Sequence, residues 1–530
     1  MSPPSVLIVG AGPVGLTAAL SLQRSGIPAQ DILVVDQRPA HDPSRTWSRA
    51  ISMSASSLEV FRVLGIADRF VAVGRPLYTN HFGAGSRLLD LNYDVIGTKY
   101  PFNMGIPQLR TEAILLQRCE ELGIKFSWGR RFSSLKQTGA GVSAIFQKSD
   151  GPESSIDGDG ETIEASWLIG CDSTHSAVRE AAGISFEGTR ATRYMWLADG
   201  TCDPDAPAMR TERVKDGKSL VVASGDGPTG RRMISTITLD ATPQHERPPA
   251  PSEQEVRDSA AKAFGSHYNF HAMTWSSVVG NGARMAGSFR SGRVFVAGDA
   301  AHQLFPSGGQ GMNTGFLDAT NLAWKLAAVI TGKIGPDQDV VERVLDSYTT
   351  ERRAAAQAVV QNGRMQMQVA FEETEEEKAA AEFIIEALCE PSLNKRWAQR
   401  FTGFGDPVEP YQLVLGSDSI VGTRLTHISN DNENALLEAT KQGLFVLAAV
   451  DEWGCTAADL GKFHEVASTI RCGDQVHVLE KPVETLADKW KPVTALLIRP
   501  DFRVAWVARS DTDAEVNQAN LEKVLKWWLG

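Results

Sequence analysis

The sequence predicts an α/β protein, and three observations support that fold class. An apolar run at Val6–Val9 leads into a G-x-G-x-x-G turn over residues 10–15. A second apolar run, Ile32–Val35, ends at an acid, Asp36, and another strand-then-turn segment recurs far along the chain at Arg293–His302. The length of 530 residues exceeds that of one ordinary domain, so we expect two or three domains.

The first glycine-rich turn has the spacing of a dinucleotide-binding βαβ unit. Gly10 permits the turn, Gly12 lets phosphates approach, and Gly15 lets the following helix pack closely. Asp36 is placed to accept hydrogen bonds from a ribose hydroxyl pair; the alternative is a capping or surface acid that only follows a strand. The residues predicted to bind a cofactor here are Gly10, Gly12, Pro13, Gly15, Asp36 and Gln37.

The spacing of apolar residues predicts the elements that follow. Helical spacing that ends at a glycine predicts helices at Ser57–Gly65 and Glu112–Gly123. The apolar run Trp167–Gly170 predicts a strand that delivers Asp172. Between about residues 190 and 284, alternating stretches such as Met233–Leu239 are separated by Gly- and Pro-rich turns, which predicts antiparallel strands.

A second glycine-rich segment can hold the far half of a long cofactor. We expect Asp299, after Gly298, to hold a ribityl hydroxyl; an ordinary helix N-cap is the alternative. Gly311 opens a helix whose N–H groups would stabilise negative charge on the pyrimidine edge of a flavin. An NAD enzyme needs no second, distant loop, so the pair of turns favours FAD. The residues predicted here are Gly298, Asp299, Pro306, Gly309, Gly311, Met312 and Asn313.

The remainder of the chain predicts long helices and then a further α/β unit. Val340–Glu390 is typical of helices, and Pro407–Pro410 marks a boundary. Strand-like runs follow at Leu444–Val450, Gln475–Leu479 and Ala495–Pro500, before a final helix.

Composition indicates which cellular compartment is expected and which kinds of partner are disfavoured. The formal charge of −11 disfavours nucleic acid or an anionic membrane as the main partner. The six cysteines include no C-x-x-C and no metal-like cluster, so we expect reduced thiols, no metal and a cytoplasmic protein. No targeting segment is expected either, because the apolar stretch near the N-terminus is interrupted by glycines and lacks a basic leader.

These motifs occur in an order that resembles one family. Gly298–His302, the Pro306–Asn313 loop and the helix Gly315–Leu326 are similar to those of the single-component FAD-dependent aromatic hydroxylases. That family includes phenol hydroxylase, hydroxyphenylpropionate hydroxylase and the polyketide hydroxylases. Shorter motifs that agree are Arg49-Ala50, Gln108–Glu112, Cys171–Arg179 and Tyr348–Arg352. The resemblance is strong over residues 5–360 and weaker beyond.

The resemblance implies a domain plan. It consists of a discontinuous Rossmann-like FAD-binding domain, an antiparallel-sheet substrate domain, a helical connector and a thioredoxin-like C-terminal domain. The FAD-binding domain comprises residues 1–75, 108–188 and 285–365, and the substrate domain comprises 76–107 and 189–284. The helical connector spans 366–410 and the C-terminal domain 411–530. Because the last domain lacks C-x-x-C, we expect packing or dimer contact there rather than thiol exchange. A homodimer is therefore one possibility.

The resemblance also implies the reaction. We expect an FAD-dependent, NADPH- or NADH-consuming monooxygenase that hydroxylates a phenolic or polyketide-type aromatic through a C4a-hydroperoxyflavin formed with O₂. FAD is expected to be non-covalently bound, and the nicotinamide cofactor to dock transiently, because no second strand–G-x-G-x-x-G–helix unit is present. The alternatives are Baeyer–Villiger or epoxidising monooxygenases of the same fold and a flavin-binding protein without turnover. The absence of W-x-W-x-I-P argues against a halogenase.

Further site residues follow from the resemblance. Arg49 and Gln108 match positions on the phosphate and flavin side of FAD, and Asp172 and Arg179 belong to a segment beside the cofactor. That segment departs from the family pattern because Ser173 replaces a glycine, which requires a backbone that tolerates a Cβ.

The substrate side is predicted from the same resemblance. The carbonyl of Pro306 would face the substrate, whereas His302 is expected to serve packing rather than act as a general base. The candidates for binding and ionising a phenol are His81, Arg193, Tyr194 and Arg231.

Overall fold

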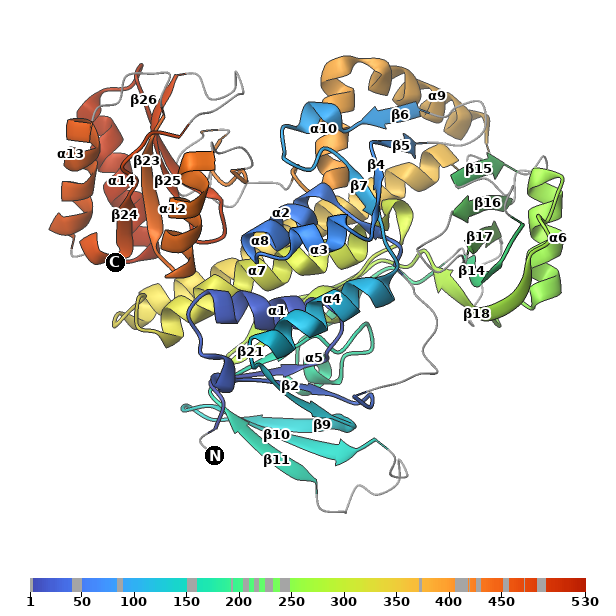
Figure 1. Ribbon diagram of the computed structural model, residues 1–530, viewed down its shortest axis with the longest axis horizontal. Helices are drawn as coiled ribbons and strands as arrows, with labels where there is room; N and C mark the ends of the chain where they lie inside the picture. The colour runs from blue at the N-terminus through green and yellow to red at the C-terminus, as the bar shows by residue number, and fades with distance from the viewer. Residues whose placement is uncertain are drawn as a thin grey trace.

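The structure is a computed structural model, and its N-terminal part is built on a six-stranded sheet (Figure 1). The strand order is β20-β21-β12-β1-β2-β8, and every neighbouring pair is parallel except β20–β21. The strands are β1 Val6–Val9, β2 Ile32–Asp36, β8 Lys125–Trp128, β12 Trp167–Gly170, β20 Arg290–Ser291 and β21 Val294–Val296. The described residues are 3–40, 50–82, 89–149, 160–191, 194–203, 209–213, 219–224, 232–238, 248–370, 374–405, 418, 420–425, 430–450, 457–470, 472–483 and 492–530.

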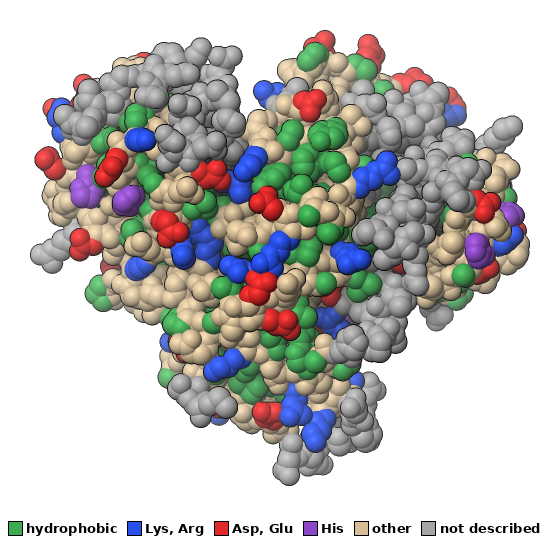
Figure 2. All heavy atoms as spheres, viewed as in Figure 1, with side chains coloured by type: hydrophobic (Ala, Val, Ile, Leu, Met, Phe, Trp, Pro, Cys, Tyr) green, Lys and Arg blue, Asp and Glu red, His purple; other side chains and the backbone are tan. Residues whose placement is uncertain are grey.

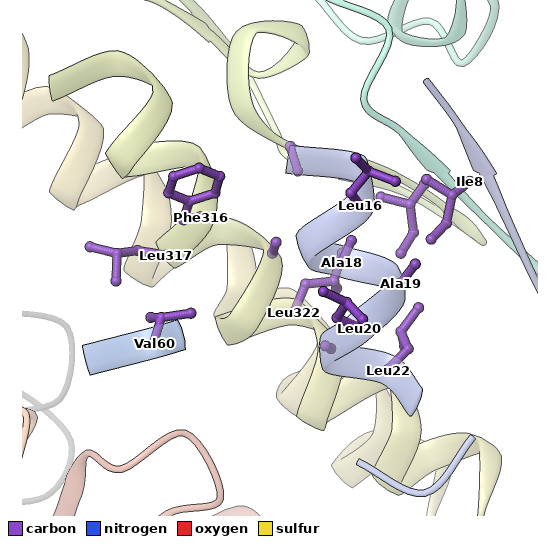
Figure 3. Packing of buried hydrophobic residues seen from close by; sticks show 14 of the residues in the cluster. Ile8, Leu16, Ala18, Ala19, Leu20, Leu22, Val60, Phe316, Leu317 and Leu322 are labelled. Carbon is purple, nitrogen blue, oxygen red and sulfur yellow. The ribbon is translucent and has the colours of Figure 1, made fainter. Parts of the chain in front are cut away.

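Each face of this sheet is covered by a different layer. Side chains alternate along β1, so Val6 and Ile8 join the core beneath the helices while Leu7 and Val9 join the core beneath a small sheet. The helices are α1 Pro13–Arg24, α4 Gln108–Glu121 and α7 Gln310–Ile330, and the small sheet contains β9 Arg130–Gln137, β10 Val142–Lys148 and β11 Glu161–Ala165. Figure 3 shows α1 packed against α7 through Leu20 and Leu322. These layers fix the ends of β1, β12 and β21 relative to one another.

A second, antiparallel sheet stands beside the first unit, with α6 Glu253–Phe264 on its outer side (Figure 1). Its order is β15-β16-β17-β14-β18, comprising β14 Tyr194–Thr201, β15 Met209–Arg213, β16 Ser219–Ser224, β17 Arg232–Thr238 and β18 His271–Gly280. Two small antiparallel sheets contain five short strands: β3 Ser52–Met53, β7 Asn103–Gly105 and β4 Arg75–Leu77 in one, and β5 Thr79–Phe82 and β6 Leu89–Asn92 in the other. The antiparallel pairing predicted by the alternating pattern is thus present.

Three helices continue the chain after α7. They are α8 Gln338–Ala370, α9 Glu375–Cys389 and α10 Pro391–Thr402. Apolar residues of all three share one cluster with Leu91 of β6 and Ala55 at the start of α2 (Ala55–Val63). These helices therefore pack against β6 and the start of α2.

The C-terminal unit is a four-stranded sheet of order β24-β23-β25-β26. Its elements are α12 Asn430–Lys441, β23 Phe445–Ala449, α13 Ala457–Thr469, β24 Val476–Val478, β25 Val493–Ile498, β26 Val504–Arg509 and α14 Ala514–Trp528. Trp324 of α7 and Val344 of α8 belong to the same apolar cluster as its strands. The unit therefore shares a continuous core with the helices of the N-terminal part.

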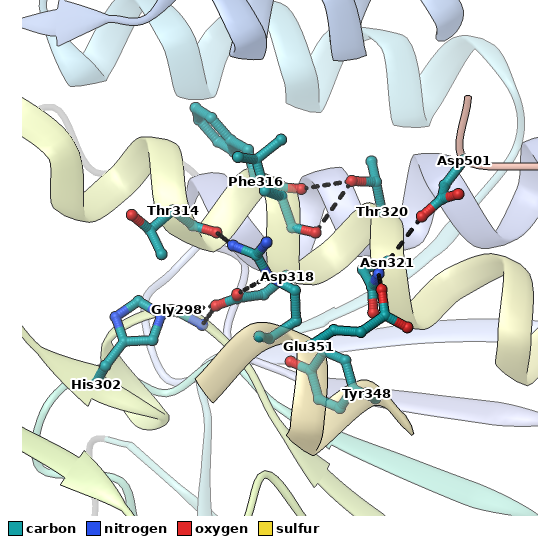
Figure 4. A network of polar contacts seen from close by, with 12 residues as sticks. Gly298, His302, Thr314, Phe316, Asp318, Thr320, Asn321, Tyr348, Glu351 and Asp501 are labelled. Atoms are coloured by element: carbon teal, nitrogen blue, oxygen red, sulfur yellow. Dashed lines mark hydrogen bonds and ion pairs between the residues drawn. The ribbon is translucent and has the colours of Figure 1, made fainter. Parts of the chain in front are cut away.

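The loop from β25 to β26 inserts a buried charge cluster against α7 and α8. Arg499 donates to Asp501 at 2.9 Å through Nε and to Glu351 of α8 at 3.0 Å through Nη2. Lys325 of α7 donates to Glu351 as well, and Asn321 donates to Glu351 at 2.7 Å. All five side chains are at most 7% exposed. Figure 4 shows Asn321 between Glu351 and Asp501.

The exterior carries both signs of charge. On the face shown in Figure 2, Lys and Arg side chains are interspersed with Asp and Glu. Within the described ranges, no helix combines the length and apolarity needed to cross a bilayer.

Candidate cofactor and active site

The turn after β1 leaves room for a ligand at Gly12. Gly10 has φ +107°, and a Cβ built there would lie 2.3 Å from the Cys171 carbonyl oxygen. A Cβ on Gly15 would lie 1.9 Å from the Gly10 carbonyl oxygen, whereas a Cβ on Gly12 would meet nothing within 4 Å. Helix α1 begins at Pro13 with no side-chain cap and no acid in its first turn. Its first N–H groups are therefore left for an anion, which suits a phosphate.

Asp36 lies beside this turn and is 7% exposed. One carboxylate oxygen accepts a hydrogen bond from the Ala11 N–H at 2.6 Å. The other accepts from the backbone N–H and the Nε of Arg38, at 2.8 and 3.0 Å. The carboxylate thus holds the glycine turn in place, and Arg38, which no motif singled out, lies directly against it.

Arg38 also links the end of β2 to the second turn of α4. Its Nη1 donates to Glu112 Oε2 at 3.1 Å. Gln108, one helical turn before Glu112, donates to Glu112 Oε1 at 2.7 Å and accepts from the Ala50 N–H at 3.2 Å. Gln108 is thereby joined to the glycine turn through a continuous polar chain.

The second turn follows β21 at the same edge of the sheet. Gly298 has φ +62°, and a Cβ built there would lie 2.9 Å from a methyl carbon of Val14 in α1. The next side chain, Asp299, is exposed. Because β1, β12 and β21 run parallel, both turns stand at the carboxyl ends of their strands, where α/β sheets bind ligands.

A buried ion network lies under the Gly298 turn (Figure 4). Asp318 of α7 accepts from the Gly298 N–H at 3.1 Å, from His302 Nε2 at 2.7 Å and from Arg352 Nε at 2.8 Å. Burial opposes the ionisation of Asp318, but His302 and Arg352 outweigh it and lower the pKa of its carboxyl. His302 is completely buried and is bonded to Asp318 beneath the turn, an environment that fits the expected packing role.

The segment after β12 is organised by capping and by one arginine. Asp172 accepts from the Ser176 hydroxyl and from the Val178 N–H at the start of α5 (Ala177–Ala181), and burial raises the pKa of Asp172. Arg179 donates to the carbonyls of Thr174 and Ala300, at 3.1 and 2.9 Å. Arg179 therefore ties this segment to the Gly298 turn and is 3% exposed.

Ser173 adopts φ +75°, a conformation that favours glycine. The strain costs an L-residue about 1–2 kcal/mol, and a glycine would lose about 0.5–1 kcal/mol through its greater unfolded-state freedom. We expect Ser173→Gly to raise the free energy of unfolding by up to about 1 kcal/mol in urea titrations of the FAD-loaded protein. Ser173→Ala should give no gain. A clear loss in the glycine variant would show that the serine hydroxyl supports the segment.

The start of α7 is the third open element. Gly309 is its N-cap with φ +64°, and the helix has no side-chain cap and no acid in its first turn. A Cβ on Gly311 would meet nothing within 4 Å. The side chain of Asn313 accepts from the Ser54 N–H and Ser57 Oγ and donates to the Ser52 and Gly309 carbonyls. Asn313 therefore fixes this end of α7 against α2 through its side chain, leaving the first N–H groups for a ligand.

The structure describes some of the residues predicted on the substrate side and not others. The Pro306 carbonyl accepts from the Gly309 N–H at 3.0 Å, and Met312 packs partly buried against the core. Strand register puts Tyr194 on the same face of β14 as Ala198, which packs with α6, whereas Met195 and Leu197 line the opposite face. Gln37 is exposed. Outside the described residues lie Arg49, Arg193, Arg231 and the side chain of His81.

Two family models account for nearly all of this architecture. The model described as an FAD binding domain matches residues 4–363, and the one described as aromatic-ring hydroxylase, C-terminal, matches residues 418–530. The chain belongs to the FAD-dependent aromatic-ring monooxygenases. FAD is therefore the cofactor of this monooxygenase, with NAD(P)H and O₂ as co-substrates.

Relatives of this monooxygenase span its full length. Rifampicin monooxygenase of Rhodococcus hoagii is 30% identical over 99% of this chain and 98% of its own. The solved structure of the anhydrotetracycline hydroxylase of Streptomyces rimosus superposes with a TM-score of 0.79 at 28% identity, covering 99% of both chains. Dialkyldecalin synthase of Streptomyces rugosporus is 29% identical over 99% of both chains.

Sequence patterns missed several residues that organise the monooxygenase site. Arg38 and Asp318 belong to no spacing rule, because their partners come from other elements. Glu112 could have been found, since it stands at i,i+4 from Gln108 on a predicted helix. Arg352 lies in a quoted motif, but only the fold shows that it reaches Asp318.

Proposed function

We propose that this monooxygenase hydroxylates a phenolic or polyketide-type aromatic compound. The observation that carries the proposal is the pair of helix starts without side-chain caps, at the N-cap residues Gly12 and Gly309, on either side of the Gly298 turn. Together they offer one long cofactor two backbone anion sites and a turn between them. When bound, FAD supplies the activation of oxygen. The similarity to a solved anhydrotetracycline hydroxylase supports a polycyclic aromatic substrate.

The residues present fit FAD, and we assign a part of the cofactor to each. The turn at Gly12 would hold the pyrophosphate, and Asp36 with Arg38 would border the adenosine ribose. The exposed Asp299 would bind the ribityl chain. The N–H groups at Gly311 would stabilise negative charge at the pyrimidine edge of the flavin.

Asp36→Ala is expected to weaken FAD binding by roughly ten- to a hundred-fold, because hydrogen bonds to a charged group contribute about 1.5–3 kcal/mol. The loss includes the bond that the carboxylate accepts from the Ala11 N–H. Fluorescence titration of the apoprotein with FAD measures the effect. Asp31→Ala, an acid just before β2, is the matched control. Unchanged affinity in the Asp36 variant would remove that residue from the site.

The domain proposals follow from topology. We keep 1–75, 108–188 and 285–365 as the FAD-binding domain and 76–107 with 189–284 as the substrate domain. The order β24-β23-β25-β26, with β23 and β24 parallel and the others antiparallel, supports a thioredoxin-like unit within 411–530. Its core is shared with α7 and α8, which supports a packing role.

The described cysteines are free thiols, which supports a cytoplasmic location.

The test of function is a screen of phenols, naphthols and hydroxyanthraquinones for stimulated NADPH oxidation, with mass spectrometry of the product. A mass gain of one oxygen on a ring carbon supports hydroxylation. Ring expansion to an ester would instead support the Baeyer–Villiger alternative, and formation of an epoxide would support the epoxidising alternative. The similarity to dialkyldecalin synthase favours a second candidate, a ring-forming enzyme, which would convert its substrate with no gain of oxygen.

A further inference from the structure

Two amide side chains are hydrogen-bonded behind the loop that precedes α7, and a third lies against the loop itself. Gln310 stands in the first turn of α7, and Asn362 and Gln366 stand one helical turn apart on the same face of α8. Gln310 is 5% exposed and Asn362 is 4% exposed. Buried amides normally have all their polar atoms paired, so the pairing of this group is informative.

The pairing fixes the orientation of two of the amides. Gln310 Nε2 donates to the carbonyl of Arg400 in α10 at 3.1 Å, so its Oε1 is the acceptor that faces α8. That oxygen accepts from Asn362 Nδ2 at 2.6 Å. Asn362 must therefore direct its own oxygen, Oδ1, away from this bond, and Oδ1 is buried with no partner among the described residues.

The third amide contributes a donor next to the loop. Gln366 Nε2 is also buried without a partner in the described part of the chain. A Cβ built on Gly308 would lie 3.5 Å from that nitrogen and 2.9 Å from the ring of Phe401 in α10. The donor thus lies directly against the loop, two residues after Pro306. A larger residue at 308 would crowd this space.

We propose that Asn362 and Gln366 form a subsite for a hydroxyl group of the aromatic substrate. A hydroxyl oxygen accepts from Gln366 Nε2 while its hydrogen is donated to Asn362 Oδ1, so one group satisfies both atoms. A buried donor and a buried acceptor without partners destabilise the folded protein, and a matching ligand removes that cost. The proposal rests on the proposed function, since it assigns part of the same substrate site.

Gln366→Met tests the subsite, because methionine keeps the length and removes the N–H donor. Probes are pairs that differ by one hydroxyl: 1-naphthol with naphthalene, and 1,8-dihydroxyanthraquinone with 1-hydroxyanthraquinone. Binding is measured on the FAD-loaded enzyme by flavin fluorescence. Wild type should prefer the hydroxylated member of a pair by about ten-fold, and Gln366→Met should reduce that preference to under about three-fold. Gln361→Met, an exposed amide on α8, is the matched control and should keep it.

The outcomes distinguish a failure of the subsite proposal from a failure of the proposed hydroxylation. An unchanged preference in Gln366→Met overturns the subsite, as does a wild type that distinguishes neither pair. A lowered thermal midpoint with unchanged preference assigns Gln366 to folding and overturns it too. NADPH oxidation and product mass are recorded for the same probes. Selective binding without any gain of oxygen would contradict the proposed hydroxylation while the subsite stands.

Discussion

Arg499→Met is expected to lower the free energy of unfolding by about 3–5 kcal/mol, because it removes the buried cation that Asp501 and Glu351 share and leaves Glu351 with Lys325 alone. Arg499 is 1% exposed, pairs with Asp501 and Glu351, and lies over the rings of Trp324 and Trp528 at 5.3 and 4.8 Å. Methionine fills a similar volume, so the loss reports the missing charge rather than a cavity. Thermal and urea unfolding of the FAD-loaded enzyme measure it.

The control is Arg69→Met, which breaks an ion pair with Glu121 whose side chains are 36% and 33% exposed. Its cost should stay within about 1 kcal/mol. Equal costs in the two variants would contradict the prediction. Burial opposes the ionisation of Asp501, but Arg499 outweighs it and lowers its pKa, so this contribution is full above about pH 4 and is lost as the pH falls. Arg499→Met should therefore flatten the acid side of the stability profile.

Asp318→Ala is expected to yield enzyme that binds FAD at least about a hundred-fold more weakly and unfolds with a loss of about 3–5 kcal/mol. The substitution removes the acceptor of the Gly298 N–H and the counter-ion of Arg352, both deeply buried. The Gly298 turn carries Asp299, which we assign to the ribityl chain, so displacement of this turn is expected to weaken FAD binding. FAD content after purification and titration of the apoprotein measure the loss.

Two further variants sharpen the Asp318 experiment. Asp318→Asn keeps an acceptor for the Gly298 N–H but loses the charge, so it should retain more FAD than the alanine variant. Asp346→Asn weakens the ion pair between Asp346 of α8 and Arg290 of β20. The Asp346 side chain is 66% exposed, so this variant should change neither property appreciably. If Asp318→Ala bound FAD as wild type does, the network would have no part in shaping the turn.

Short-range patterns predicted the elements well. The strands at Val6–Val9 and Trp167–Gly170 were predicted to the residue, because buried parallel strands are continuous apolar runs with clear ends. The tail strands were placed within a few residues, and the helix predicted at Ser57–Gly65 begins earlier, at Ala55, because Ser54 caps it. The family was also predicted from ordered motifs and is confirmed by the matching models.

Contacts between distant elements could not be read from the sequence. The contact of Asp318 with the Gly298 N–H depends on the packing of α7 beneath that turn. The contact of Arg38 with Glu112 depends on the packing of α4 beside β2. The amides of Gln310 and Asn362 follow no chemical motif, since their meeting depends on how α7 and α8 pack. Cofactor roles for individual residues stay predictions, among them those of Asp36, Asp299 and Arg179.

The loop between β25 and β26 is synthesised much later than the helices α7 and α8 that it contacts. Glu351 and its partner Arg499 are 148 residues apart, so α7 and α8 leave the ribosome long before the strands that cover them. Until then the Trp324 ring lacks its contacts with Phe445 and Trp528 and leaves apolar surface exposed, as incompletely folded chains do. We therefore expect this face of α7 and α8 to become fully buried only when the C-terminal sheet has been synthesised and has packed against it.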